Sequence, residues 1–166
     1  GYTKLYKYDI QVYCECDILR VDGYILFTKR GSVQMNNFEF FTRLERTIRE
    51  KKRGAMLVVC NSEASSPGRE GFKMAVFPDG SMFGSIGGGV MEFNIVNKLI
   101  ERLRSGEEFN YLKEFQHKDI KGEARSGLIC SGAQYVSINS LNERDIPLLC
   151  EINACFSERR IWALSL

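Results

Sequence analysis

The chain has 166 residues, of which 44% are hydrophobic and 27% charged, an ordinary composition for a domain with its own core. Its net charge of +2 is too small to indicate a nucleic-acid surface, and no apolar run approaches the roughly 20 residues that span a bilayer. The polar first residues, GYTKLYKYD, do not resemble an export signal. We therefore expect a cytoplasmic protein with no nucleic-acid or membrane partner.

Cysteine usage supports the same compartment. The six cysteines are scattered, none forms a C-x-x-C pair, and the chain has a single histidine, His117. This pattern predicts reduced thiols that act mainly as small core residues. It predicts neither a zinc site nor a cysteine–histidine nucleophile pair.

The N-terminal part of the chain has the pattern of a β-hairpin. Residues 4–34 alternate partly with period two, and an Asp22-Gly23 turn separates two strand-like runs. Two strands are marginally stable alone, so we expect residues 1–36 to form a hairpin extension that docks as extra strands or as a homo-oligomer contact.

The next segments alternate between helical and extended patterns. Asn36 is a candidate N-cap for a helix over 37–53, and residues 55–62 form a continuous apolar run typical of a buried strand. Two short strands surround a turn at Pro78-Asp79-Gly80, and a second helix covers 90–104.

These elements predict an α/β fold for residues 37–166. We expect a single domain with a mixed β-sheet around residues 55–60, flanked by the helices 37–53 and 90–104. After the second helix, a polar stretch predicts a strand broken by a loop. Residues 128–141 return to a strand, interrupted at Ser131-Gly132, and the C-terminal segment predicts a helix or strand followed by a terminal strand.

Three loops rich in glycine or serine stand at strand ends. They are ASSPGREGFKM (64–74), GSIGGGVME (84–92) and GLICSGAQYVSI (127–138). Ligands of α/β proteins gather at strand ends, so the three loops are expected to converge on one pocket. Gly87, Gly88 and Gly89 run into a helix N-terminus, which is either a phosphate site or simply a tight turn.

In order and spacing the motifs resemble those of the XdhC/CoxI family, whose members mature xanthine dehydrogenase, carbon monoxide dehydrogenase and related molybdenum hydroxylases. The pattern G-S-T-P-R-x-x-G-x-K-M is matched by Ser65, Pro67, Gly71, Lys73 and Met74. The more specific pattern D-G-x-x-x-G-T-I-G-G-G-x-x-E is matched by Asp79, Gly80, Gly84, Ile86, Gly87, Gly88, Gly89 and Glu92. The pattern G-x-x-C-G-G is matched in part by Gly127, Cys130 and Gly132.

The resemblance extends over residues 37–140 and has departures. Ala64, Ser66 and Ser131 replace family Gly, Thr and Gly, and Gly68 stands at the arginine position with Arg69 one place later. The N-terminal hairpin has no family counterpart. Typical members carry a second, Rossmann-like domain after this one, and a separate Rossmann-domain chain is one possible partner here.

The resemblance implies an accessory protein, a chaperone rather than an enzyme. It would bind the molybdenum cofactor (molybdopterin) transiently and deliver it to an apo xanthine dehydrogenase-type hydroxylase, with no catalytic or metal-site residues of its own. The implied cofactor-binding residues are Ser65, Ser66, Arg69, Lys73, Gly84, Gly87, Gly88, Gly89, Glu92, Cys130 and Gly132. The glycine amides would hold the pterin phosphate, Lys73 and Arg69 would add charge-assisted contacts, and Cys130 would be a soft ligand or sulfur-handling thiol.

Simpler interpretations of these residues stay open. Lys73 could be a surface charge, Cys130 an inert core thiol, and Glu92 a helix cap or a group that holds the loop closed. Two other functions also remain. One is a small phosphate- or nucleotide-binding enzyme with Cys130 as nucleophile, and the other is a degenerate scaffold that no longer binds cofactor.

Overall fold

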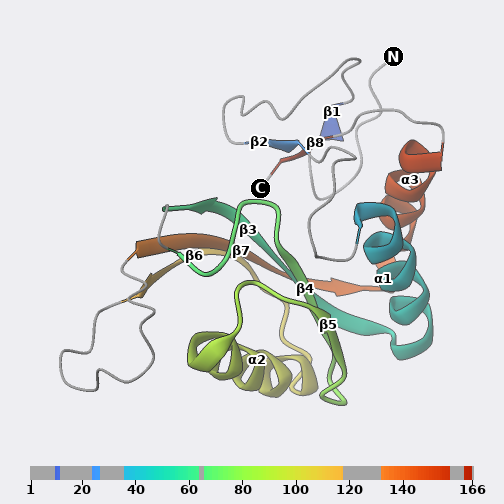
Figure 1. Cartoon of the computed structure of the whole chain (residues 1–166). Helices are drawn as coiled ribbons and strands as arrows, with labels where there is room; N and C mark the ends of the chain where they lie inside the picture. Colours follow the sequence, from blue (N-terminus) through green and yellow to red (C-terminus); the bar gives the residue numbers. More distant parts are fainter. Residues whose placement is uncertain are drawn as a thin grey trace. The chain divides into compact units, whose positions relative to one another are not determined.

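The computed structural model describes residues 10–11, 24–26, 36–63, 66–117, 132–157 and 163–165 (Figure 1). The chain forms two compact units. One contains residues 54–140, and the other contains residues 1–53 together with 141–166. The α/β class predicted from the sequence is confirmed.

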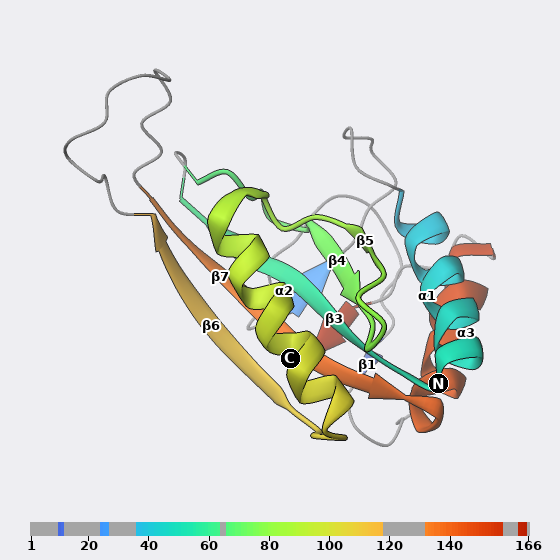
Figure 2. The same ribbon diagram turned by 90° about the horizontal axis from the view of Figure 1, so that it is seen from below.

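The unit of residues 54–140 is built on a five-stranded sheet with the strand order β5-β4-β3-β7-β6. Its strands are β3 (Arg53–Ser62), β4 (Lys73–Val76), β5 (Met82–Gly84), β6 (Asn110–His117) and β7 (Gly132–Asn142). The helix α2 (Gly89–Arg104) follows β5 and lies along one face of the sheet in both views (Figures 1 and 2).

The sheet is antiparallel, so the prediction of a mixed sheet was wrong in strand direction. The reason lies in the connections. Ten residues join β3 to β4 and five join β4 to β5, both fewer than the roughly dozen or more that a crossover between parallel strands needs. The single helical crossover, α2, leads from the edge strand β5 to the opposite edge strand β6, so it creates no parallel neighbours.

The core of this unit lies between the sheet and α2. Alternate residues of β3 and β4, such as Leu57 and Met74, meet Leu99 and Leu103 of the helix. Because side chains alternate along a strand, Val58 and its register partner Lys73 belong to the opposite face. This alternation determines which face of the sheet each candidate side chain occupies.

The first helix begins where the sequence predicted it. Asn36 caps α1 (Asn37–Lys51), and its side-chain oxygen accepts a hydrogen bond from the Glu39 amide at 2.9 Å. The helix ends two residues before the predicted Arg53, because Lys52 takes the left-handed conformation (φ 67°) and closes it. Arg53 then opens β3, two residues before the predicted strand start.

The predicted C-terminal segment forms a helix followed by a strand. A 3-10 turn, η1 (Glu143–Asp145), leads into α3 (Ile146–Ser157), and α1 and α3 pack side by side. The buried side chains of the two helices are apolar and are Phe40, Phe41, Leu44, Ile48, Leu149, Ile152 and Cys155. Helices α1 and α2 were both expected to flank the sheet. Helix α1 belongs to the unit of residues 1–53 and 141–166, where it packs against α3.

Among the described residues, three short strands also belong to this unit. β1 (Ile10–Gln11) and β2 (Tyr24–Leu26) each pair antiparallel with β8 (Ala163–Ser165), which lies between them. The predicted hairpin would have paired the two N-terminal strands with each other. Its Asp22-Gly23 turn lies outside the described residues.

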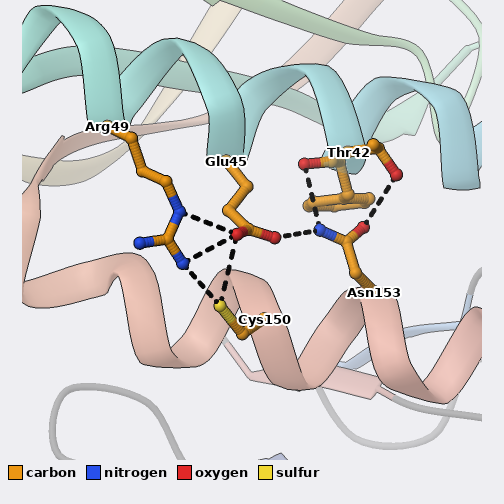
Figure 3. Close-up of polar contacts among 6 residues, drawn as sticks. Thr42, Glu45, Arg49, Cys150 and Asn153 are labelled. Carbon is orange, nitrogen blue, oxygen red and sulfur yellow. Dashed lines mark hydrogen bonds and ion pairs between the residues drawn. The ribbon is translucent and has the colours of Figure 1, made fainter.

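A polar network crosses the α1–α3 contact (Figure 3). Glu45 accepts hydrogen bonds from Arg49 at 3.0 Å, from the Cys150 thiol at 3.3 Å and from the Asn153 amide at 2.7 Å. Arg49 also donates to the Cys150 sulfur at 3.1 Å. The hydrogen bonds of this network therefore join mainly side chains, which project from two regular helices.

Candidate functional site

The glycines of residues 84–89 have two different roles. All four have positive φ, with values of 77° at Gly84, 129° at Gly87, 78° at Gly88 and 75° at Gly89. A Cβ atom at Gly84 would collide with the Lys73 carbonyl oxygen, and one at Gly87 would lie 2.7 Å from the Gly68 nitrogen. These two positions are glycine because the backbone packs against backbone there.

Gly88 and Gly89 face open space instead. A Cβ atom at either position would have no heavy atom within 4 Å. The chain therefore presents bare backbone at the start of α2, with room for another molecule to approach it. The exposed side chains of Val90 and Phe93, 76% and 66% accessible, follow in the first turns of the helix.

The carboxylate of Glu92 folds back onto this loop. Its Oε2 accepts three hydrogen bonds, from the Ser85 hydroxyl at 2.7 Å, the Ile86 amide at 2.8 Å and the Gly88 amide at 3.0 Å. These bonds fit both interpretations of Glu92, since Gly88 is the N-cap residue of α2 while Ser85 and Ile86 belong to the loop before it. Two of the amides expected to meet a phosphate already have an anionic partner in the chain.

Donors remain at the first turn of α2. In any α-helix the first amides have no intrahelical acceptor, which here applies to Gly89, Val90 and Met91. These amides, and not those of Ile86 and Gly88, are the ones left for an incoming acceptor. A phosphate, if bound as predicted, would therefore meet the first turn of α2.

Gln134 connects the motifs, although the sequence analysis did not single it out. Its side chain is completely buried, and its Oε1 accepts from the Ser66 hydroxyl at 2.8 Å and the Gly68 amide at 3.2 Å. Its Nε2 donates to the Ile86 carbonyl at 3.0 Å. Gln134, from the third of the glycine- and serine-rich motifs, thus contacts the first two. The common pocket expected at this convergence stays a prediction. The sequence signals Gln134 weakly, because the same strand also contains the polar residues Ser137, Asn139 and Ser140.

The Gly68 position is explained by the same contact. A Cβ atom there would collide with the Ile86 carbonyl oxygen and lie 2.5 Å from the Gln134 Oε1 atom. An arginine, the residue of the family pattern, would not fit this backbone arrangement. The departure at Gly68 is therefore coupled to the close approach of the two loops.

Lys73 is buried, so the interpretation as a surface charge was wrong. Its side chain is 5% exposed, its Nζ donates to the Gly71 carbonyl at 2.6 Å, and burial lowers the pKa of its amine to about 8. Its carbonyl accepts from the Ser85 amide at 2.8 Å, but its side chain leaves on the sheet face opposite α2. The backbone of Lys73 thus adjoins the glycine loop (residues 84–89), while its amine lies on the opposite face of the sheet.

The other candidates are placed in part. Arg69 is exposed in the turn before β4, and Gly132 opens β7 in register with His117. Ser65 and Cys130 lie outside the described residues. In the part of the chain that the structure describes, no group of three His, Cys, Asp or Glu side chains could hold a metal ion, and no helix is long and apolar enough to cross a membrane.

Comparison with known proteins agrees with the motifs. Residues 47–115 match the XdhC and CoxI family. The match includes the first two motifs, residues 64–74 and 84–92. It ends before the third motif. The resemblance inferred from the sequence is thus confirmed over this range.

A solved structure shares the fold. It is a Bacillus halodurans protein described as a xanthine dehydrogenase, which is 18% identical to this chain with a TM-score of 0.53. The alignment covers 71% of this chain and 35% of that protein, so the chain corresponds to about a third of its neighbour. No curated protein matches the chain.

Proposed function

We propose that this chain is an accessory protein in the maturation of a molybdenum hydroxylase and that it binds the molybdenum cofactor. The observation that carries the proposal is the XdhC and CoxI family match over residues 47–115, which contains the glycine loop. The likeness to a protein described as a xanthine dehydrogenase is consistent with it. An apo-hydroxylase of that type would be the partner, with transient loading of the cofactor before transfer.

The described residues fit the phosphate end of such a cofactor at the start of α2. Gly88 and Gly89 leave space that a side chain would fill, and the first-turn amides of the helix favour an anion there. Glu92 keeps these glycines in position and reduces the positive potential of the helix end. Arg69, exposed in the neighbouring loop, would supply a compensating positive charge.

The remaining candidates keep the roles that the resemblance implies. Cys130 would be the soft thiol ligand or sulfur-handling group, and Ser65 and Ser66 would contribute hydroxyl groups from the first motif. The bound cofactor would supply a dithiolene-held metal, and the protein residues would bind and shield it. Lys73, whose amine is still mostly protonated at pH 7 with a pKa of about 8, leaves the sheet on the face opposite α2, so its contact with the cofactor stays a prediction from the resemblance.

The test is a comparison of two glycine variants with equal backbone strain. Gly88 and Gly71 have φ of 78° and 81°, and both face open space, but only Gly88 lies in the proposed site. Protein from a molybdenum-replete host should contain molybdenum and pterin. Gly88→Val should abolish this content, and Gly71→Val should retain it.

Titration of the apo-protein with molybdopterin gives the second measurement. Gly88→Ala replaces Gly88→Val if the larger residue prevents folding. Wild-type protein that carries and binds no pterin would refute the proposal, and equal binding by the Gly88 and Gly71 variants would remove the glycine loop from the site. Transfer to an apo-hydroxylase would then be measured as recovered hydroxylase activity.

A further inference from the structure

The carbonyl and the amide of Ile86 are held by two different side chains. The Gln134 amide donates to its carbonyl oxygen at 3.0 Å, and the Glu92 carboxylate accepts from its nitrogen at 2.8 Å. Ile86 itself is completely buried in the core under α2. The residue that precedes the glycines is therefore fixed by packing and by hydrogen bonds on both sides.

The same two side chains extend to the neighbouring segments. Gln134 accepts from Ser66 and Gly68, while Glu92 accepts from Ser85 and Gly88. A continuous hydrogen-bonded path thus runs from the loop of residues 66–68 through Gln134 and Ile86 to Glu92 and α2. The steps through Gln134 span 68 and 48 residues of sequence, whereas the step from Ile86 to Glu92 spans six.

Alternative partners for these groups are few. Gln134 is completely buried, so the Ser66 hydroxyl, the Gly68 amide and the Ile86 carbonyl would lose their partner if its side chain were shortened. A buried polar group without a partner is costly, so the two loops would have to rearrange together. The close backbone approach of Gly87 to Gly68 makes independent movement of the loops harder still.

We infer that Gln134 and Glu92 are positioning residues that make the loop of residues 66–68 and the glycine loop move as one unit. The functional consequence of this inference rests on the proposed function, because the two coupled loops would set the shape of the cofactor site. Gln134 contacts the loops from the sheet and does not need to touch the ligand. The ligand would meet the outer side of Gly88 and Gly89.

Coupling between the loops can be measured without any ligand. In amide hydrogen exchange of the full chain, Ser66→Ala should speed exchange at Ile86 and Gly88, although Ser66 bonds to neither. Glu92→Gln should likewise speed exchange at Gly68. Both remote effects should disappear in a Gln134→Leu background, because the connecting side chain is then absent. Remote effects that persist in that background, or that never occur, would overturn the inference.

A matched control separates positioning from general stability. Asn139 is also buried on β7, at 1% exposure, but it alternates onto the face opposite α2, and its Nδ2 bonds only to Ser137, at 2.7 Å. Asn139→Leu should therefore leave exchange at Gly68 and Gly88 unchanged. Gln134→Leu should weaken molybdopterin binding by about tenfold or more, as expected when a buried hydrogen bond is lost, and Asn139→Leu should not.

The outcomes for the two proposals are distinct. If wild-type protein binds no molybdopterin but the exchange effects are coupled, the proposed function fails and the structural coupling stands. If molybdopterin binds and Gln134→Leu binds it as tightly as wild type does, Gln134 is not a positioning residue. If Gln134→Leu does not fold, the single variants at Ser66 and Glu92 still decide the coupling, with Asn139→Leu as reference.

Discussion

Two polar networks in the described part of the chain are built in opposite ways, one between α1 and α3 and one around Ile86. In the helix pair, Glu45, Arg49, Cys150 and Asn153 bond mainly to one another (Figure 3). Around Ile86, Gln134 and Glu92 bond mainly to backbone groups. The first network is placed by helices that form for other reasons, whereas the second helps to determine the path of the chain itself.

This difference predicts different sensitivities to substitution. A side-chain network on regular helices can lose a member and leave the backbone in place. A loop with positive φ and backbone-to-backbone contact has no such freedom. The following experiments compare the two regions, from the largest expected effect to the smallest.

The largest effect is expected at Gly84. Gly84→Ala would add a Cβ atom that collides with the Lys73 carbonyl oxygen, in a residue that already has φ of 77°. We expect a loss of about 3 kcal/mol or more in the free energy of unfolding, measured by urea denaturation. Gly71→Ala has φ of 81° and open space, so it should cost only about 1–2 kcal/mol. Equal losses would show that conformational strain, and not packing, dominates both sites.

Lys73 should give the sheet unit a marked pH dependence. Burial lowers the pKa of its amine from 10.5 to about 8, so between these values the unfolded state binds more protons than the folded state. The free energy of unfolding should therefore rise with pH from about 8 to 10.5, by at most about 3 kcal/mol from this group. Lys73→Met should remove the rise, and a wild-type slope that persists in this variant would assign it to other groups.

Substitution of Glu45 should lower the free energy of unfolding less than substitution of Gly84 does. Burial tends to raise its pKa, but hydrogen bonds from Asn153, Arg49 and Cys150 outweigh that effect, and the pKa is lowered. Its stabilising effect is thus present at neutral pH and lost as the pH falls through the lowered pKa. Because Arg49 is half exposed, Glu45→Gln should cost only about 1 kcal/mol at pH 7 and nothing in strong acid. A loss as large as that at Gly84 would contradict the comparison.

The smallest effect concerns the reactivity of Cys150. Burial and the Glu45 carboxylate raise the pKa of its thiol, while Arg49 opposes them. Glu45→Gln should therefore speed alkylation by iodoacetamide at pH 8, and Arg49→Gln should slow it, each by a factor of about three to ten. Cys155, which is buried in the same helix, serves as the unreactive reference in a mass-spectrometric assay. Unchanged rates would mean that access and not charge controls this thiol.

Local sequence rules predicted the elements well. Asn36 starts α1 because its side chain can satisfy the Glu39 amide, and the apolar spacing of Leu99 and Leu103 places α2 against the sheet. Strand direction could not be predicted as well, because it depends on which strands become neighbours. The order β5-β4-β3-β7-β6 is a tertiary result.

The glycine motif and its family were readable from the sequence alone, because positive φ and backbone contact restrict those positions to glycine wherever they occur. The partners of the motif were decided only by the tertiary structure. Glu92 satisfies the amides expected to meet a phosphate, Gln134 joins the loops, and strand alternation directs the Lys73 amine to the other face. Such pairings depend on register and on contacts between distant segments, for which a linear pattern contains no signal.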